Sequence, residues 1–243
     1  MIKYLSLFCL ALISMHSTVK ADSLWIETDP TGVPGKAQKI KVIFGSYNQY
    51  RLQKVGAEFQ EVKDFTCWIV SPSGKKYYPS FTPNDTCYEA MFTPEEKGVY
   101  VVLLENKQRK VEDWRLSATK IGIAKQHYYA RTTIQIGDGT LMAEDNQTDL
   151  SVIVEGGGVT GRDVHLLVLL HGQPVKDAVV FMRYPGSEEQ KQTTGATGKV
   201  AFTASRAGRY FFLVTLKFES PGTYKGVHYD VFREKSTCTA VVR

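Results

Sequence analysis

The residues of this chain with the clearest potential for chemistry are its histidines, because imidazole nitrogens bind transition metals. Those that lie beyond residue 21 are His127, His165, His171 and His228. His165 and His171 fall on one face of a predicted strand. Six residues at about 3.3 Å each separate them by about 20 Å, too far to share one ion on a straight strand. A metal site would therefore need histidines from different strands.

His127 and His228 are the histidines that we expect at a module edge, because tyrosines stand beside both in the sequence. Divalent transition metals are the cofactors such a site would take. The spacing of the histidines matches no ligand motif. Ordinary surface or interface histidines therefore stand as the alternative interpretation.

Catalytic motifs are absent from the sequence, which contains no Gly-x-Ser-x-Gly, His-Glu-x-x-His or Cys-x-x-Cys. The stretch GATGK at 195–199 resembles a phosphate loop only in part. Thr193 stands where the first glycine belongs, and Val200 where a magnesium-binding hydroxyl belongs. The acidic pairs at 95–96 and 188–189 are predicted in turns, whereas glycoside hydrolysis needs two carboxylates across a cleft. We predict that the protein is not an enzyme.

Trp25 and Trp114 are candidates for a ligand platform, because an exposed indole ring can stack against a sugar. Trp25 lies near the predicted mature terminus, and Trp114 lies among charged residues. This observation favours a second class of function, a surface adhesion or carbohydrate-binding protein.

Cys67 and Cys87 occupy neighbouring strand-like runs, 65–70 and 86–92. A disulfide between them would close a loop of about twenty residues and stabilise the fold by ~3 kcal/mol, so we predict this bridge. Cys238 shares a predicted strand face with Ala240 and Val242, and we expect it to be a buried thiol.

The amino terminus predicts export. Residues 1–21 combine Lys3, an apolar stretch at 4–15 and a small-residue ending at Ala21, as in a cleaved secretory signal peptide. The apolar stretch is too short to span a bilayer, and no later segment is long enough to be a transmembrane helix. We expect a periplasmic or secreted protein.

The charge balance gives no argument for nucleic acid or an anionic membrane as a partner. Removing Lys3 and Lys20 with the signal lowers the formal net charge from +5 to +3. Acidic and basic residues are interspersed without a basic cluster. The charge pattern thus gives no reason to expect a nucleic-acid partner.

The elements that must position these residues are strands. Short apolar runs alternate with turn residues, and they predict strands at 40–44, 65–70, 77–81, 86–92, 99–105, 131–136, 150–154, 164–170, 179–183, 199–203, 210–218 and 232–242. We predict an all-β protein with two tandem immunoglobulin-like or Cna-B-like β-sandwich modules. The first covers 22–138, a polar linker covers 139–148 and the second covers 149–243.

Several short segments carry a family resemblance over essentially the whole mature chain. They are LWIE at 24–27, GQPV at 172–175, GKVAF at 198–202, GRY at 208–210 and PGTYKG at 221–226. Together they resemble the nickel uptake transporter family of NikM-like periplasmic proteins, many of which carry only a domain-of-unknown-function label. The second module alone resembles carboxypeptidase-regulatory-like domains. The resemblance implies an exported β-sandwich protein associated with transition-metal or TonB-dependent uptake.

Two departures from the family pattern add candidate ligands. Similar proteins usually begin the mature chain with a histidine before the aromatic segment, where this chain has Asp22. They often carry a histidine after the arginine of the last strand, where this chain has Glu234 after Arg233. Carboxylates are harder ligands than imidazole. The candidate metal ligands are thus His127, His228, Asp22 and Glu234. A purely structural spacer, whose loops dock a membrane transporter or an outer-membrane receptor, remains a third function class.

Overall fold

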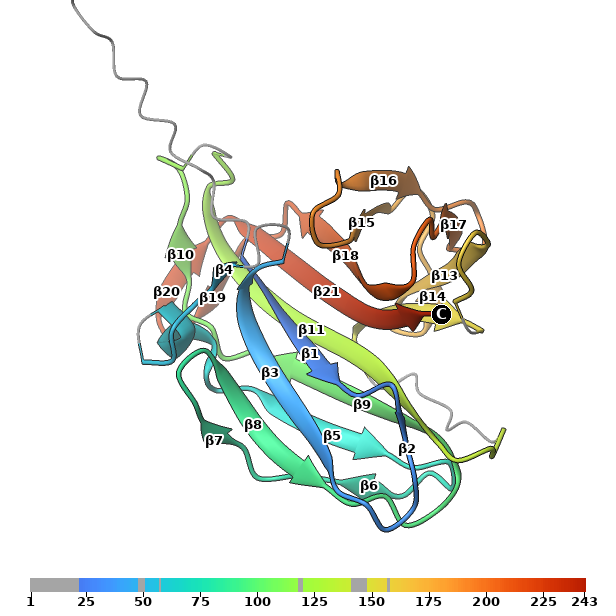
Figure 1. The fold of residues 1–243 in the computed structure, drawn as a ribbon. Coiled ribbons are helices and arrows are strands. Elements are labelled where there is room, and N and C mark those ends of the chain that lie inside the picture. Colours follow the sequence, from blue (N-terminus) through green and yellow to red (C-terminus); the bar gives the residue numbers. More distant parts are fainter. Residues whose placement is uncertain (1–21, 48–50, 57, 118–119, 141–147, 157) are drawn as a thin grey trace, which may run out of the picture.

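The computed structural model describes residues 22–47, 51–56, 58–117, 120–140, 148–156 and 158–243 (Figure 1). The predicted signal peptide and residues 141–147 of the predicted linker lie outside the described residues. Within these ranges the regular elements are strands apart from one 3-10 helix, η1 (Glu58–Val62). The prediction of an all-β protein with a sandwich-like arrangement of sheets is confirmed.

The first sheet has the strand order β1-β3-β8-β7, with β4 beside β3. Its strands are β1 (Ser23–Thr28), β3 (Gln38–Ser46), β4 (Arg51–Leu52), β7 (Thr82–Pro83) and β8 (Cys87–Phe92). Alternation of side chains along β3 places Ile40, Val42 and Phe44 in the core, as the period of two in the sequence predicts.

The second sheet has ten strands and runs through the whole molecule. Its order is β16-β15-β18-β21-β11-β9-β5-β6, and β10 and β2 also pair with β11. These strands are β2 (Thr31–Gly32), β5 (Thr66–Val70), β6 (Lys76–Tyr77), β9 (Gly98–Asn106), β10 (Glu112–Asp113), β11 (Ile123–Ile136), β15 (Val179–Arg183), β16 (Gln190–Thr193), β18 (Gly208–Phe218) and β21 (Val231–Val242). At its centre β11 and β21 pair in parallel, side by side in Figure 1.

The third sheet contains β12 (Leu150–Glu155), β13 (Asp163–Leu170), β14 (Gln173–Pro174) and β17 (Lys199–Thr203). A separate hairpin is formed by β19 (Gly222–Tyr224) and β20 (Val227–Tyr229). The third sheet packs on the ten-stranded sheet through apolar side chains of β12, β13, β18 and β21.

The two faces of the ten-stranded sheet carry different cores. Along β11, Tyr128, Ala130 and Ile134 enter the core shared with the first sheet. Tyr129 points the other way, into the core shared with the third sheet. Each large apolar side chain buried in these cores contributes about 1.5–3 kcal/mol. Because both cores depend on β11, this strand holds one position and orientation relative to all three sheets.

The ten-stranded sheet combines strands from both predicted modules, since β21 from the second range pairs with β11 from the first. The division into modules at 139–148 stays a prediction. Because of this pairing, residues of β11 and β21 lie beside one another although they are far apart in the chain.

The predicted disulfide between Cys67 and Cys87 is wrong, because both cysteines are free thiols. Cys67 lies in the core between the first and second sheets. Cys87 lies in a third cluster with Trp25 and Phe211, on the opposite face of the first sheet. The first sheet therefore separates the two side chains, and they cannot be bridged without moving the backbone. Cys238 is buried, as expected.

Candidate metal centre

A histidine and two carboxylates from three parts of the chain meet at the edge of the core shared by the ten-stranded sheet and the third sheet. His127 lies on β11 and Glu234 on β21, and the parallel register makes them direct Cα partners. Asp149 immediately precedes β12, which packs on the same face of the sheet. Ligand atoms of the three residues all lie within 4.8 Å of one another. Metal–ligand distances of about 2.1 Å place two ligands of one ion no more than about 4.2 Å apart, so small side-chain rotations would let one ion contact all three.

The hydroxyl group of Tyr129 lies among these three side chains. It is 3.1 Å from Asp149 Oδ2, 3.1 Å from Glu234 Oε1 and 3.4 Å from His127 Nδ1. A hydroxyl has one proton to donate, so it cannot satisfy both carboxylates. Glu234 Oε2 is buried and lacks a hydrogen-bond partner among the described residues. Lys107 Nζ also contacts Asp149 Oδ2, so the acceptor left without a donor is Glu234 Oε2, and a bound cation would satisfy it.

The electrostatics of the cluster prepare His127 and Asp149 for ligation, whereas Glu234 must lose its proton to bind a metal ion. Burial lowers the pKa of His127 to about 4, with the charges of Lys125 and Lys107 adding to the effect. The imidazole is therefore neutral at pH 7 and offers a nitrogen lone pair. Burial raises the pKa of Glu234, and the nearby charge of Asp149 adds to this. Burial likewise raises the pKa of Tyr129, so its hydroxyl stays protonated.

Lys107 supplies the positive charge closest to Asp149 among the ion pairs of the described residues. Its Nζ lies 2.9 Å from Asp149 Oδ2 and 3.1 Å from Glu105 Oε2. Burial acts to raise the pKa of Asp149, but the hydrogen bond and charge of Lys107 outweigh it and lower the pKa. Asp149 is therefore an ionised carboxylate that already attracts a cation.

His171 stands at the solvent side of the cluster, directly after β13. Its Nδ1 lies 3.8 Å from Asp149 Oδ1, and 65% of its side-chain surface is exposed. Its backbone N–H donates a hydrogen bond of 2.6 Å to the carbonyl oxygen of Asp149. The pairing of β12 with β13 creates this contact, because Leu150 and Leu170 are Cα partners.

The predicted ligands His127 and Glu234 thus meet, whereas Asp22 makes other contacts. The carboxylate of Asp22 accepts hydrogen bonds from Gln53 Nε2 at 2.6 Å and from Arg51 Nη2 at 3.3 Å. Its carbonyl oxygen accepts another at 2.6 Å from Nζ of the buried Lys235. These bonds hold the start of β1 in place and give Asp22 a structural role.

His228 also lies apart from the cluster of ligand atoms. It sits on β20, in the separate hairpin, with 61% of its side-chain surface exposed. Its Nε2 lies 3.1 Å from Asp230 Oδ1. Sequence reasoning missed Asp149, whose only signal is an acidic residue where the polar linker meets a strand.

The predicted ligand platform at Trp25 is wrong, because this side chain is fully buried. Its ring packs edge-on against Tyr47 and Phe211 at centroid distances of 5.6 and 5.9 Å. Trp114 is half-buried, and the guanidinium groups of Arg233 and Arg109 lie 5.2 and 5.9 Å from its ring centroid. Two arginine side chains therefore already contact the ring that was predicted to stack against a sugar.

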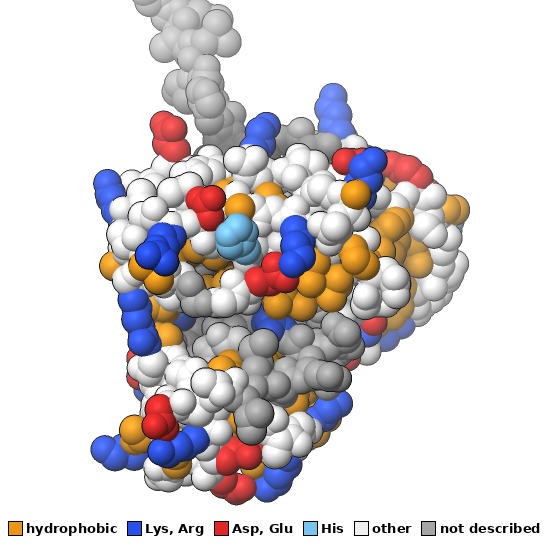
Figure 2. All heavy atoms as spheres, turned by 90° about the vertical axis from the view of Figure 1, so that its right-hand side faces the viewer, with side chains coloured by type: hydrophobic (Ala, Val, Ile, Leu, Met, Phe, Trp, Pro, Cys, Tyr) orange, Lys and Arg blue, Asp and Glu red, His pale blue; other side chains and the backbone are white. Residues whose placement is uncertain are grey.

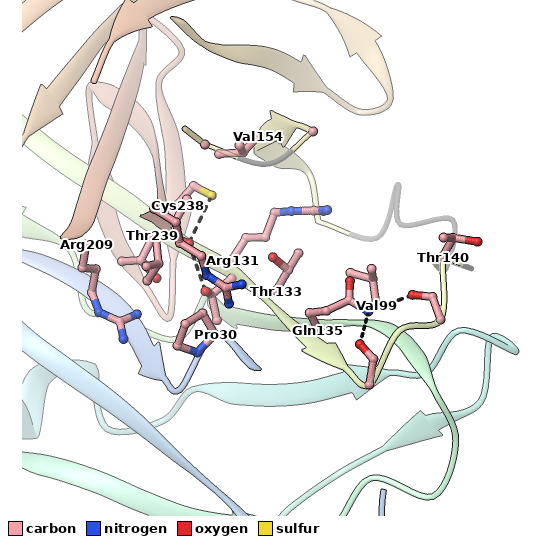
Figure 3. Close-up of a pocket in the computed structure, with 18 of the residues that line it drawn as sticks. Pro30, Val99, Arg131, Thr133, Gln135, Thr140, Val154, Arg209, Cys238 and Thr239 are labelled. Atoms are coloured by element: carbon pink, nitrogen blue, oxygen red, sulfur yellow. Dashed lines mark hydrogen bonds between the residues drawn. The ribbon is translucent and has the colours of Figure 1, made fainter. Parts of the chain in front are cut away.

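A cavity of about 710 Å³ opens further along the same strand pair. Arg131 and Cys238, which are Cα partners on β11 and β21, line it together with Val154 from the third sheet and Arg209 from β18 (Figure 3). Thr132 Oγ1 donates a hydrogen bond of 2.9 Å to the carbonyl oxygen of Thr239 in its wall. This cavity begins four residues beyond the His127–Glu234 pair on each strand.

The face of the molecule in Figure 2 carries acidic and basic side chains interspersed with apolar ones, without a region of one sign. This distribution agrees with the sequence-based prediction of no basic cluster. Among the described residues, no helix is long and apolar enough to cross a membrane.

Comparison with known proteins identifies a family. A family model described as "Domain of unknown function (DUF4198)" matches residues 19–217. The curated proteins contain no match. Among solved structures, a marsupial T cell receptor aligns with 93% of this chain and 73% of its own at 11% identity, with a TM-score of 0.26. This TM-score is too low to support an inference about fold or function. Since the family model spans most of the sequence, this protein belongs to the DUF4198 family of domains of unknown function.

Proposed function

We propose that this protein is an exported, non-enzymatic accessory protein of transition-metal uptake, which binds a divalent metal ion through His127, Asp149 and Glu234. The observation that carries the proposal is the meeting of one imidazole and two carboxylates within 4.8 Å. The unpaired Glu234 Oε2 supports it. The metal is cargo in this proposal.

The donor set favours particular ions. Nitrogen and oxygen donors together suit borderline ions such as nickel, cobalt and zinc, whereas magnesium and calcium prefer oxygen donors alone. Binding also requires deprotonated ligands. His127 meets this condition because its low pKa keeps it neutral, and Asp149 meets it because its pKa is lowered.

Uptake and location rest on the sequence. The signal-like residues 1–21 support export to the periplasm or beyond, and the resemblance to NikM-like proteins supports a role beside a transporter or an outer-membrane receptor. In this role the protein would capture the ion outside the inner membrane and deliver it through a protein contact. The half-exposed position of Asp149 leaves the ion accessible to such a partner.

The decisive experiment is isothermal titration of the metal-free protein beginning at Asp22, without a tag, with nickel, cobalt and zinc. We expect saturable binding near one equivalent. His127→Ala should weaken it by more than the ~10–100-fold that loss of an outer-shell partner costs. His228→Ala is the matched control, because His228 is exposed and pairs with Asp230, and it should bind as the unmodified protein does. Absence of saturable binding, or an equal loss in the control, would refute the proposal.

A further inference from the structure

His171 has a backbone conformation that an L-amino acid rarely adopts. Its φ is +49°, and it is one of four non-glycine residues with positive φ among the described residues. A side chain at positive φ costs free energy because Cβ approaches the backbone, whereas glycine adopts this conformation without the cost. The next residue, Gly172, also has positive φ. Residues 171 and 172 form the two-residue turn between β13 and β14, because Leu170 and Gln173 are Cα partners, and turns of this length favour positive φ at both positions. The turn therefore fixes the backbone of His171 at the end of β13.

The surrounding backbone holds the imidazole of His171 beside the candidate metal centre. Pairing of β12 with β13 places residue 171 opposite Asp149, and the 2.6 Å backbone hydrogen bond joins the two residues. The ring nitrogen Nδ1 lies 3.8 Å from Asp149 Oδ1. Two ligands of one tetrahedral ion at about 2.1 Å lie about 3.4 Å apart. A small change in side-chain rotation would bring the two atoms to this separation.

The two oxygens of Asp149 have different neighbours. Lys107 Nζ contacts Oδ2 at 2.9 Å, as does the Tyr129 hydroxyl at 3.1 Å. His171 faces Oδ1. An ion held between Oδ1 and the imidazole of His171 would therefore leave the contact of Lys107 with Oδ2 in place.

We infer that His171 is the fourth protein ligand of the metal centre, which gives a set of two imidazoles and two carboxylates. This inference rests on the proposed function, and it narrows the substrate class to borderline divalent transition-metal ions. A second imidazole shifts the preference further toward zinc, nickel and cobalt and away from magnesium and calcium. Because His171 is the most exposed of the four, it is the ligand that an incoming ion meets first and a departing ion leaves last.

The test compares His171→Gly with Lys225→Gly. Lys225 has the same φ of +49° and lies in the turn of the β19–β20 hairpin. Each substitution relieves strain, so each should raise the unfolding midpoint of the metal-free protein by about 2–4 °C. His171→Gly should also weaken binding of zinc and of cobalt by at least about 10-fold, while Lys225→Gly should leave both affinities unchanged.

X-ray absorption on the nickel-loaded protein supplies a second readout. The scattering from imidazole should correspond to two rings in the unmodified protein and to one in His171→Gly. If glycine loosens the turn, His171→Asn repeats the test, because asparagine also tolerates positive φ.

The failures of the two proposals are distinguishable. Equal metal affinity in the unmodified protein and His171→Gly, with a loss in His127→Ala, would overturn the role of His171 and leave the proposed function standing. No binding by the unmodified protein would overturn both.

Discussion

Replacement of Glu234 by glutamine should have opposite effects on stability and metal binding. In the metal-free protein, Glu234 Oε2 is buried without a partner among the described residues, and Oε1 shares the single Tyr129 proton with Asp149. A glutamine side chain has the same shape, carries no charge and offers two N–H donors. It can donate to the carboxylate of Asp149, which Glu234 repels.

The magnitude can be worked from these contacts. An unsatisfied buried acceptor costs about 1–3 kcal/mol. Two unit charges 4.8 Å apart repel by about 3.5 kcal/mol at an effective dielectric constant near 20, but part of this is already avoided because the raised pKa of Glu234 favours its neutral form. We expect a net stabilisation of about 1–2 kcal/mol at pH 7, or about 3–6 °C in the unfolding midpoint for a chain of this size.

The assay is thermal unfolding in the presence of EDTA, followed by titration of the metal-free variant with zinc. Zinc affinity should fall by more than about 100-fold, because a carboxyl group that can deprotonate on binding is replaced by an amide that cannot. Glu219→Gln is the control, since this exposed residue pairs with Lys217 on the surface and should change stability by less than about 0.5 kcal/mol. A Glu234→Gln protein less stable than the unmodified protein by about 1 kcal/mol or more, with unaltered zinc affinity, would refute the reasoning.

Four further predictions concern the surroundings of the metal centre and the buried side chains of the fold. Lys107→Met should raise zinc affinity about 10-fold in titration calorimetry, because it removes a positive charge 2.9 Å from Asp149; Lys110→Met, an exposed control, should not. The chain from Asp22 should show three thiols to Ellman's reagent when denatured without reductant and almost none when native. Burial raises the pKa of Cys238 from 9.0 to about 11, so the thiol stabilises the folded state below pH 9, and this stabilisation should be lost between pH 9 and 11. The expected loss in the free energy of unfolding, measured by urea unfolding, is on the order of 3 kcal/mol. A loss in that pH range no larger than the one shown by Cys238→Ala would contradict the assignment. Trp25→Ala should cost about 3–5 kcal/mol in the same assay, and a cost below about 1 kcal/mol would show that the side chain is not packed as described.

Strand identity could be predicted from local pattern alone. Along β3 the apolar residues at 40, 42 and 44 alternate with Lys39, Lys41 and Ile43, and a period of two indicates an extended strand whose alternate side chains face one core. The same pattern, repeated between turn residues, established the all-β class. The absence of a basic cluster could also be predicted from the sequence, because it depends only on the number and spacing of the charged residues.

Which face each side chain occupies was decided by tertiary structure. Cys67 and Cys87 both lie on strands, as predicted, but a shift of one residue moves a side chain to the opposite face of a sheet. The two thiols consequently enter different cores. Trp25 is near the predicted mature terminus, where exposure is common, yet β1 packs between sheets and buries it completely.

The candidate site depended most on non-local pairing. Tyr129 and Glu234 stand 105 positions apart, and only the parallel register of β11 with β21 brings His127 and Glu234 together. Sequence reasoning reached His127 from its residue type and Glu234 from a family resemblance, but it had no signal for Asp149 beyond one acidic residue before a strand, which resembles any solvated loop residue. Side-chain chemistry was therefore determined by the sequence alone, whereas the meeting of three ligands was decided by strand register, which depends on contacts between distant parts of the chain.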